Sequence, residues 1–68
     1  MTIGARIVAV RMTRGMAAVT LAERIGIDKA QVSRWENDHQ MPDLYNLKRI
    51  CDALNASADY IIGRTEKP

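Results

Sequence analysis

The side chains that could carry out catalytic or metal chemistry are few in this sequence of 68 residues. One histidine, His39, and one cysteine, Cys51, cannot complete a tetrahedral metal site within a single chain. Ser33 and Ser57 lack the histidine and acid partners that would activate a hydroxyl nucleophile. The sequence therefore predicts that the protein is not an enzyme and holds no metal or other cofactor.

The composition is that of one small helical domain. Apolar residues make up 47% of the chain and phenylalanine is missing, so we expect a core of Ile, Leu, Val, Met and Ala with Trp35, Tyr45 and Tyr60. No apolar run approaches the roughly 18 residues of a membrane span, and the first residues do not read as a secretory signal, which predicts a cytoplasmic protein. A net charge of +2 permits nucleic-acid binding without arguing for it.

Helical periodicity runs through the whole chain. The apolar spacing and the capping residues predict helices over residues 3–13, 17–25, 29–37, 44–54 and 57–62. The cleanest apolar stripe consists of positions 44, 47, 50, 51 and 54, and Cys51 within it is expected to be a buried small hydrophobic residue rather than a reactive thiol. The predicted fold is an all-α bundle of about five short helices. Its domain covers residues 1–63, and residues 64–68 form a charged, mobile tail.

Ala22, Gly26, Val32 and Trp35 define how the second and third helices are joined. Close approach of the two helices requires the small Ala22, and a chain reversal with positive φ requires Gly26, which has no Cβ. Val32 and Trp35 then fall on one face of the following helix and anchor it to the core. This spacing predicts a helix-turn-helix whose outer face is free to contact a ligand.

A longer ordered series of residues carries a resemblance to a known family. The series consists of Leu21-Ala22, Gly26, Val32-Ser33, Trp35-Glu36, Pro42 and Asp59 to Arg64. It resembles the phage-repressor family of helix-turn-helix proteins, also called the Cro or Xre type and lambda-repressor-like. The resemblance implies a compact helical domain that binds operator DNA as a twofold homodimer, with its third helix in the major groove.

The resemblance also implies roles for positions of the third helix. Family members read bases with residues at its start and on its outer face, which here are Lys29, Ala30, Gln31, Ser33 and Arg34, with Gln31 near the DNA backbone. Lys29 and Arg34 can donate to guanine O6 and N7, and Ala30 can contact a thymine methyl group. Arg34 is the first choice for a specificity residue; the alternative is that both cations are only solvated.

The implied phosphate contacts depart from the family pattern at the second helix. Relatives begin it with Ser, Thr or Asn followed by Gln, whereas this chain has Ala17 and Ala18, so only backbone N–H groups are left to meet a phosphate. The other expected phosphate contacts are Arg14, Asn37, His39 and Gln40. Asp38 occupies a position where glycine is common, and Asp43 repels DNA unless it turns inward as a helix cap.

Two further expectations concern stability. Arg11 and Glu36 match a pair that links the first helix to the end of the third in several relatives, and both are expected to be partly buried. Trp35 could pack in the core or stack on a base, and its place in the anchor series favours the core. These residues, with Ala22, Gly26 and Val32, are therefore predicted to be structural.

The function implied is a sequence-specific transcriptional regulator, a repressor of phage, prophage or bacterial origin that binds an inverted-repeat operator. The expected partners are double-stranded DNA and a second copy of the chain, contacted through Asn55, Ala56, Ile61 and Ile62, without membrane or small-molecule ligand. An antitoxin or a restriction-modification controller of the same fold is an alternative. A protein-interaction module that has lost DNA binding is another, favoured by the two alanines of the second helix.

Overall fold

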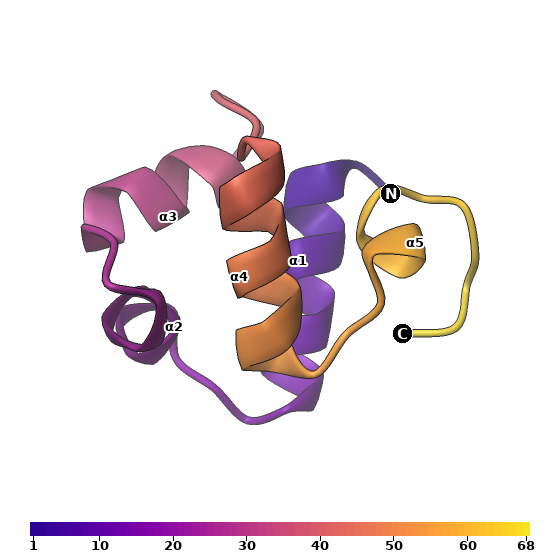
Figure 1. The fold of residues 1–68 in the computed structure, drawn as a ribbon, viewed down its shortest axis with the longest axis horizontal. Helices are drawn as coiled ribbons and strands as arrows, with labels where there is room; N and C mark the ends of the chain where they lie inside the picture. Colours follow the sequence, from indigo (N-terminus) through magenta and orange to yellow (C-terminus); the bar gives the residue numbers. More distant parts are fainter.

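The computed structural model describes all residues from Met1 to Pro68 and contains helices without strands (Figure 1). The helices are α1 (Ile3–Thr13), α2 (Ala18–Ile25), α3 (Lys29–Glu36), α4 (Leu44–Leu54) and α5 (Ala58–Ile61). The predicted all-α fold class is confirmed. The boundaries differ at residues that act as caps: Ala17, Asn37, Ser57 and Ile62. None of the helices has the length and apolar content that crossing a membrane requires.

Side-chain caps start every helix except α2. Thr2, Asp28, Asp43 and Ser57 each accept a hydrogen bond from a backbone N–H group of the first turn that follows. Such caps satisfy donors that a helix leaves free at its start. Ala17 has no side-chain acceptor, so the first turn of α2 keeps its N–H groups without this partner.

α2 and α3 form a helix-turn-helix at one edge of the molecule (Figure 1). Gly26 ends α2 with a φ of 68°, the left-handed conformation that a residue without Cβ adopts at little cost. α3 packs against α1 and α2, and α4 packs against α2 and α5. One side of α3 is therefore held by the protein, and its other side faces outward.

All five helices contribute to one core of 12 buried residues. Ala22, Val32 and Trp35 belong to it, with exposed fractions of 3%, 0% and 2%, as their spacing predicted. Cys51 is buried as well, and desolvation raises the pKa of its thiol. It therefore acts as a small hydrophobic residue, as predicted.

The predicted core was wrong at the start of α4. Leu44 and Tyr45 are 84% and 69% exposed. The neighbours of α4 are α2 and α5, which cover its later turns, so the first turn extends past the core (Figure 1). The Tyr45 ring instead lies against the Arg49 guanidinium, whose carbon is 5.2 Å from the ring centroid. Among the methionines, only Met16 packs against the core cluster.

α1 begins in close contact with the end of α3. A Cβ on Gly4 would collide with the carbonyl oxygen of Trp35 and would lie 2.6 Å from that of Glu36. Real Cβ atoms do not approach backbone oxygens so closely, so this helical position has room only for a glycine. Gly4 therefore sets how near α1 can come to α3.

A largely buried ion pair joins the same two helices. Arg11 Nε and Nη2 donate to the two carboxylate oxygens of Glu36 at 2.7 and 3.2 Å, and Nη1 donates to the Met16 carbonyl oxygen at 2.9 Å. The exposed fractions of the Arg11 and Glu36 side chains are 14% and 11%. The predicted pair is present, and it fixes α3 to α1 and to the connection that leads into α2.

The chain after Gly63 lies against the domain and is joined to it by hydrogen bonds. Arg6 is only 6% exposed and donates to the Thr65 carbonyl oxygen and to the Glu66 carboxylate, the latter at 2.8 Å. The Ser57 N–H group donates to the Pro68 carbonyl oxygen, also at 2.8 Å. A buried guanidinium needs acceptors around it; the tail and the Tyr60 carbonyl oxygen supply them for the two Nη atoms, whereas Nε has no partner.

Arg11→Ala is expected to lower the free energy of unfolding by about 3–5 kcal/mol, because Glu36 would stay buried without its partner. Urea denaturation followed by circular dichroism measures this change. Lys48→Ala is the matched control, since it breaks a pair whose side chains are 72% and 65% exposed. We expect the control to lose far less stability, because water screens this exposed pair. Equal losses in the two variants would contradict the role given to the buried pair.

Candidate nucleic-acid interface

The outer side of α3 brings together the residues that the sequence analysis assigned to base reading. Lys29, Ala30, Ser33 and Arg34 are exposed, and Gln31 is half-buried. Neither Lys29 nor Arg34 forms an ion pair with an acidic residue. Both cations are therefore available to bind acceptor groups of a partner.

A chain of hydrogen bonds orders part of this surface. Gln31 Oε1 accepts from Arg34 Nε at 3.2 Å and from Nη2 at 2.9 Å. Gln31 Nε2 donates in turn to Gln40 Oε1 at 2.8 Å. Gln40 belongs to the loop after α3, and its backbone N–H donates back to the Arg34 carbonyl oxygen. The loop and the outer side of α3 are thus joined by side-chain and backbone bonds.

The other polar residues expected near phosphates follow in the same loop. The Asn37 side-chain amide donates to the Ser33 carbonyl oxygen at 2.9 Å and closes the last turn of α3. The His39 backbone N–H donates to the Arg34 carbonyl oxygen at 2.9 Å, and its side chain is exposed. Asn37, His39 and Gln40 therefore lie together where α3 ends.

The start of α2 offers backbone donors only. Ala17 is an exposed N-cap with extended backbone, and Ala18 is the half-buried first residue of the helix. The partial positive charge of a helix start and its free N–H groups suit an anionic oxygen. The backbone N–H groups are therefore the hydrogen-bond donors that remain at this end of α2.

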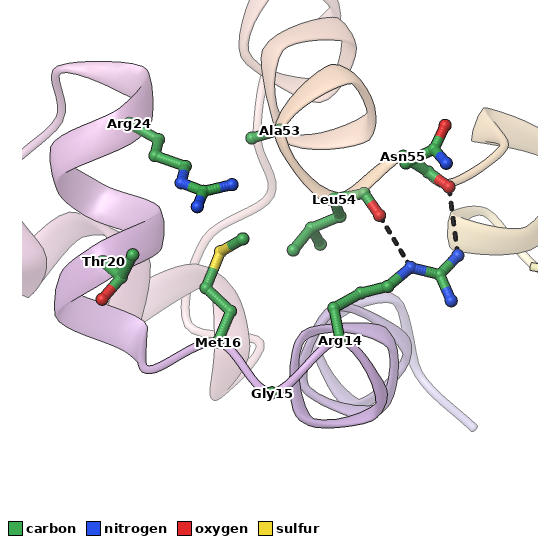
Figure 2. A pocket seen from close by; sticks show the side chains of 8 residues that line it. All are labelled: Arg14, Gly15, Met16, Thr20, Arg24, Ala53, Leu54 and Asn55. Carbon is green, nitrogen blue, oxygen red and sulfur yellow. Dashed lines mark hydrogen bonds between the residues drawn. The ribbon is translucent and has the colours of Figure 1, made fainter.

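The Arg14 side chain differs from these residues in having its hydrogen-bond partners within the protein. Its guanidinium donates to the carbonyl oxygens of Leu54 at 3.0 Å and Asn55 at 3.1 Å, where α4 ends (Figure 2). Figure 2 shows this side chain directed toward the end of α4 at the rim of a depression, with Arg24 of α2 on the opposite side. Arg14 satisfies carbonyl groups that a helix end leaves free, so its guanidinium is engaged within the protein.

Two aspartates near the interface are occupied within the protein. Asp43 Oδ1 accepts from the Asn46 N–H at 2.8 Å, so its carboxylate is turned into the start of α4 as a cap. Asp38 has a φ of 60° and accepts hydrogen bonds from the Thr2 hydroxyl and the Gly4 N–H. These two bonds hold the pKa of Asp38 below its ordinary value. Asp38 thereby ties the loop after α3 to the start of α1.

Residues 7–61 match a protein-family profile described as Helix-turn-helix. The chain belongs to the helix-turn-helix family. The matched segment of this helix-turn-helix protein begins within α1 and ends with α5, so it includes the Gly26 turn and the whole of α3. The predicted family resemblance is confirmed over this segment.

Two relatives of the helix-turn-helix protein are named as a regulator and a repressor. HTH-type transcriptional regulator ImmR of Bacillus subtilis (strain 168) is 30% identical over 66 residues, which are 97% of this chain and 52% of ImmR. The immunity repressor protein of Bacillus phage phi105 is 33% identical over 63 residues, which are 93% of this chain and 44% of that repressor. The chain thus spans about half the length of these relatives.

Solved structures of other regulators share the fold. The P22 c2 repressor in complex with a synthetic operator superposes with a TM-score of 0.88 at 28% identity, covering 96% of this chain and 98% of that chain. SinR, the master regulator for biofilm formation, in complex with DNA gives a TM-score of 0.83 at 30% identity, covering 88% and 97%. The restriction-modification controller protein C.AhdI from Aeromonas hydrophila gives 0.83 at 25% identity, covering 88% and 91%.

The sequence analysis missed several residues that hold the domain and the interface in place. Arg6 was overlooked although it lies three residues after Ile3 and four before Val10, a spacing that puts it on the buried side of α1. Gly4 was a signal of close approach, because glycine inside a helix is otherwise unfavourable. The bond from Gln31 to Gln40 had no signal in the sequence, since it depends on how the loop folds back.

The Asp38 tie to α1 predicts a pH-dependent contribution to stability. The pKa of Asp38 is lowered in the folded protein, so the charged carboxylate stabilises the fold at pH values above its ordinary pKa of 3.8. This stabilisation is lost as the pH falls through the folded-state pKa. The urea midpoint of Asp38→Asn is expected to lie furthest below that of the wild type near neutral pH, and the difference should become smaller in acid. Glu23→Gln, which removes an exposed carboxylate without an ion pair, is the control. The same pH dependence in both variants would contradict the assignment to Asp38.

Proposed function

We propose that the protein is a sequence-specific DNA-binding transcriptional repressor. The observation that carries the proposal is the outer side of α3, where Lys29 and Arg34 are free of acidic partners while the opposite side is anchored in the core. An α-helix fits the major groove of B-DNA, where both cations can reach base edges. The names of ImmR and of the phi105 immunity repressor, and the operator bound to the P22 c2 repressor, support this function.

In this proposal, contacts to bases are flanked by contacts to phosphates. Lys29, Ala30, Ser33 and Arg34 face the bases. Phosphates are met by the backbone N–H groups at Ala17 and Ala18 on one side, and by Asn37, His39 and Gln40 on the other. Few of these phosphate contacts are cationic, so a single domain over residues 1–63 binds weakly and a second copy is required.

Two copies related by a twofold axis would place their α3 helices in successive major grooves about 34 Å apart, which requires an inverted-repeat operator. Asn55, Ala56 and the 43% exposed Ile62 are the proposed contacts between the copies. Ile61 is not among these contacts, because its exposed fraction is 0%. Its predicted role as a dimer contact was wrong. The helical period of α5 turns Ile61 into the core and Ile62 outward.

A restriction-modification controller is a second candidate function, supported by the similarity to C.AhdI. An antitoxin would use the same surface, and both differ from a phage repressor in the genes beside the operator rather than in the domain. A repressor, a controller and an antitoxin of this kind all act on DNA and need no catalytic site. We therefore propose that the protein is not an enzyme and is located in the cytoplasm. An interaction module without DNA binding is the competing class, favoured by the two alanines at the start of α2, which offer no side-chain contact to a phosphate.

The purified protein is expected to enrich an inverted repeat from random duplex DNA, with half-sites about 10 base pairs apart centre to centre. The logarithm of the binding constant for the enriched site should fall linearly with the logarithm of the salt concentration, because phosphate contacts release counterions. Fluorescence anisotropy at two salt concentrations measures both affinity and slope. Failure to enrich any sequence, with residual binding that fades with salt, would favour the interaction module.

Arg34→Ala is expected to lose about 1–3 kcal/mol of binding free energy on the enriched site and to relax preference at one base step. Arg24→Ala is the matched control, because Arg24 is an exposed arginine on α2 that lines a depression beside α4. The control should bind with nearly wild-type affinity and unchanged preference. An equal loss on all sequences for Arg34→Ala would make it a phosphate contact.

A further inference from the structure

We infer that Gln31 and Gln40 act as positioning residues for Arg34 and that the base pair read by Arg34 is a G·C pair with guanine O6 and N7 as the acceptors. The inference rests on the proposed function and names the part of the operator that this site recognises. It is carried by the hydrogen bonds that join Arg34 to Gln31 and Gln31 to Gln40.

The guanidinium of Arg34 offers two edges, and one of them is occupied within the protein. Nε and Nη2 form the side edge, and both donate to Gln31 Oε1, at 3.2 and 2.9 Å. The end edge, formed by Nη1 and the remaining N–H of Nη2, has no acceptor within the protein. Two parallel donors at this edge match the two adjacent acceptors of guanine in the major groove. Adenine presents a donor in place of O6, so this edge discriminates against it.

Gln31 is poorly placed to read a base itself. A glutamine that recognises adenine uses its amide oxygen and its amide nitrogen together. Here the oxygen accepts both bonds from Arg34, and the nitrogen donates to Gln40 at 2.8 Å. Gln31 is also half-buried, unlike its exposed neighbours on α3. Its earlier assignment to the base-reading set is therefore replaced by a role through Arg34.

Gln40 holds Gln31 because the loop after α3 returns to the helix. The backbone N–H of Gln40 lies 3.3 Å from the Arg34 carbonyl oxygen, and that of His39 lies 2.9 Å from the same oxygen. The loop is also tied to α1 through Asp38, whose carboxylate accepts from Gly4 N at 2.9 Å. The far end of the hydrogen-bond chain is thus attached to the rigid part of the domain. Fixing a flexible arginine before binding reduces the entropy lost on recognition.

The inference is tested by measuring the preference for guanine in variants that break the hydrogen bonds from Arg34 to Gln31 and from Gln31 to Gln40. On the enriched operator, the ratio of affinities for G·C and A·T at the step that depends on Arg34 is compared between wild type and Gln31→Met. Methionine keeps the length of the side chain and removes both polar atoms. We expect the preference to fall about two- to tenfold, the equivalent of one net hydrogen bond. Gln40→Met should lower it at the same step by less, because Gln31 then loses the acceptor of its Nε2 group while its oxygen still accepts from Arg34.

Two further measurements separate positioning from direct contact. In an Arg34→Ala background, Gln31→Met should leave the preference at this step unchanged, since nothing remains to be positioned. In the free protein, the order parameter of the Arg34 Nε–H bond should fall in Gln31→Met, while the urea midpoint stays that of the wild type.

Each contrary result would overturn the inference. A loss of preference at a different base would make Gln31 a base reader, and an equal loss on all sequences would make it a phosphate contact. An operator without a guanine at the Arg34 step would refute the assignment of the base pair while leaving the proposed function intact. Absence of sequence-dependent binding by the wild-type protein would instead remove the proposed function, and this inference with it.

Discussion

The Arg11–Glu36 ion pair is the interaction on which the rest of the domain depends. It is bidentate, it is largely removed from water, and a third bond from Arg11 reaches the Met16 carbonyl oxygen in the connection to α2. One guanidinium therefore contacts α1, the end of α3 and the chain between α1 and α2. A buried charge that loses its partner is strongly unfavourable, so these elements keep a single mutual arrangement. Gly4 adds to this constraint by allowing α1 to lie against the last carbonyl groups of α3.

The need for such anchoring follows from the length of α3. It has 8 residues, and isolated helices shorter than about 12–15 residues are marginal in water. Val32 and Trp35 are its only buried residues, so most of its surface is left for contact with a partner. Caps and tertiary contacts must therefore supply the stability that its own hydrogen bonds do not. A short helix held at both ends presents its outer side chains with little freedom of orientation, which suits recognition of base edges.

The cations are divided between structure and recognition. Arg6, Arg11 and Arg14 donate to backbone carbonyl groups within the domain. Lys48 and Arg64 pair with acidic residues on the surface. The net charge of +2 hides this division, because it counts cations that hold the fold together with those that face outward. The location of each cation, and not the total, makes α3 the candidate DNA-binding surface.

The sequence by itself determined the features that depend on neighbouring residues. The helix cap at Asp43 and the turn at Gly26 were predicted, because each needs only a local hydrogen bond or a permitted φ value. The burial of Val32 and Trp35 followed from helical spacing. Only the tertiary structure decided the exposure of Leu44, because periodicity identifies an apolar side of a helix but not how far its neighbours cover it. It likewise directed Arg14 to the end of α4 and joined Gln31 to Gln40, because long side chains choose partners that only the packing of distant segments brings within reach.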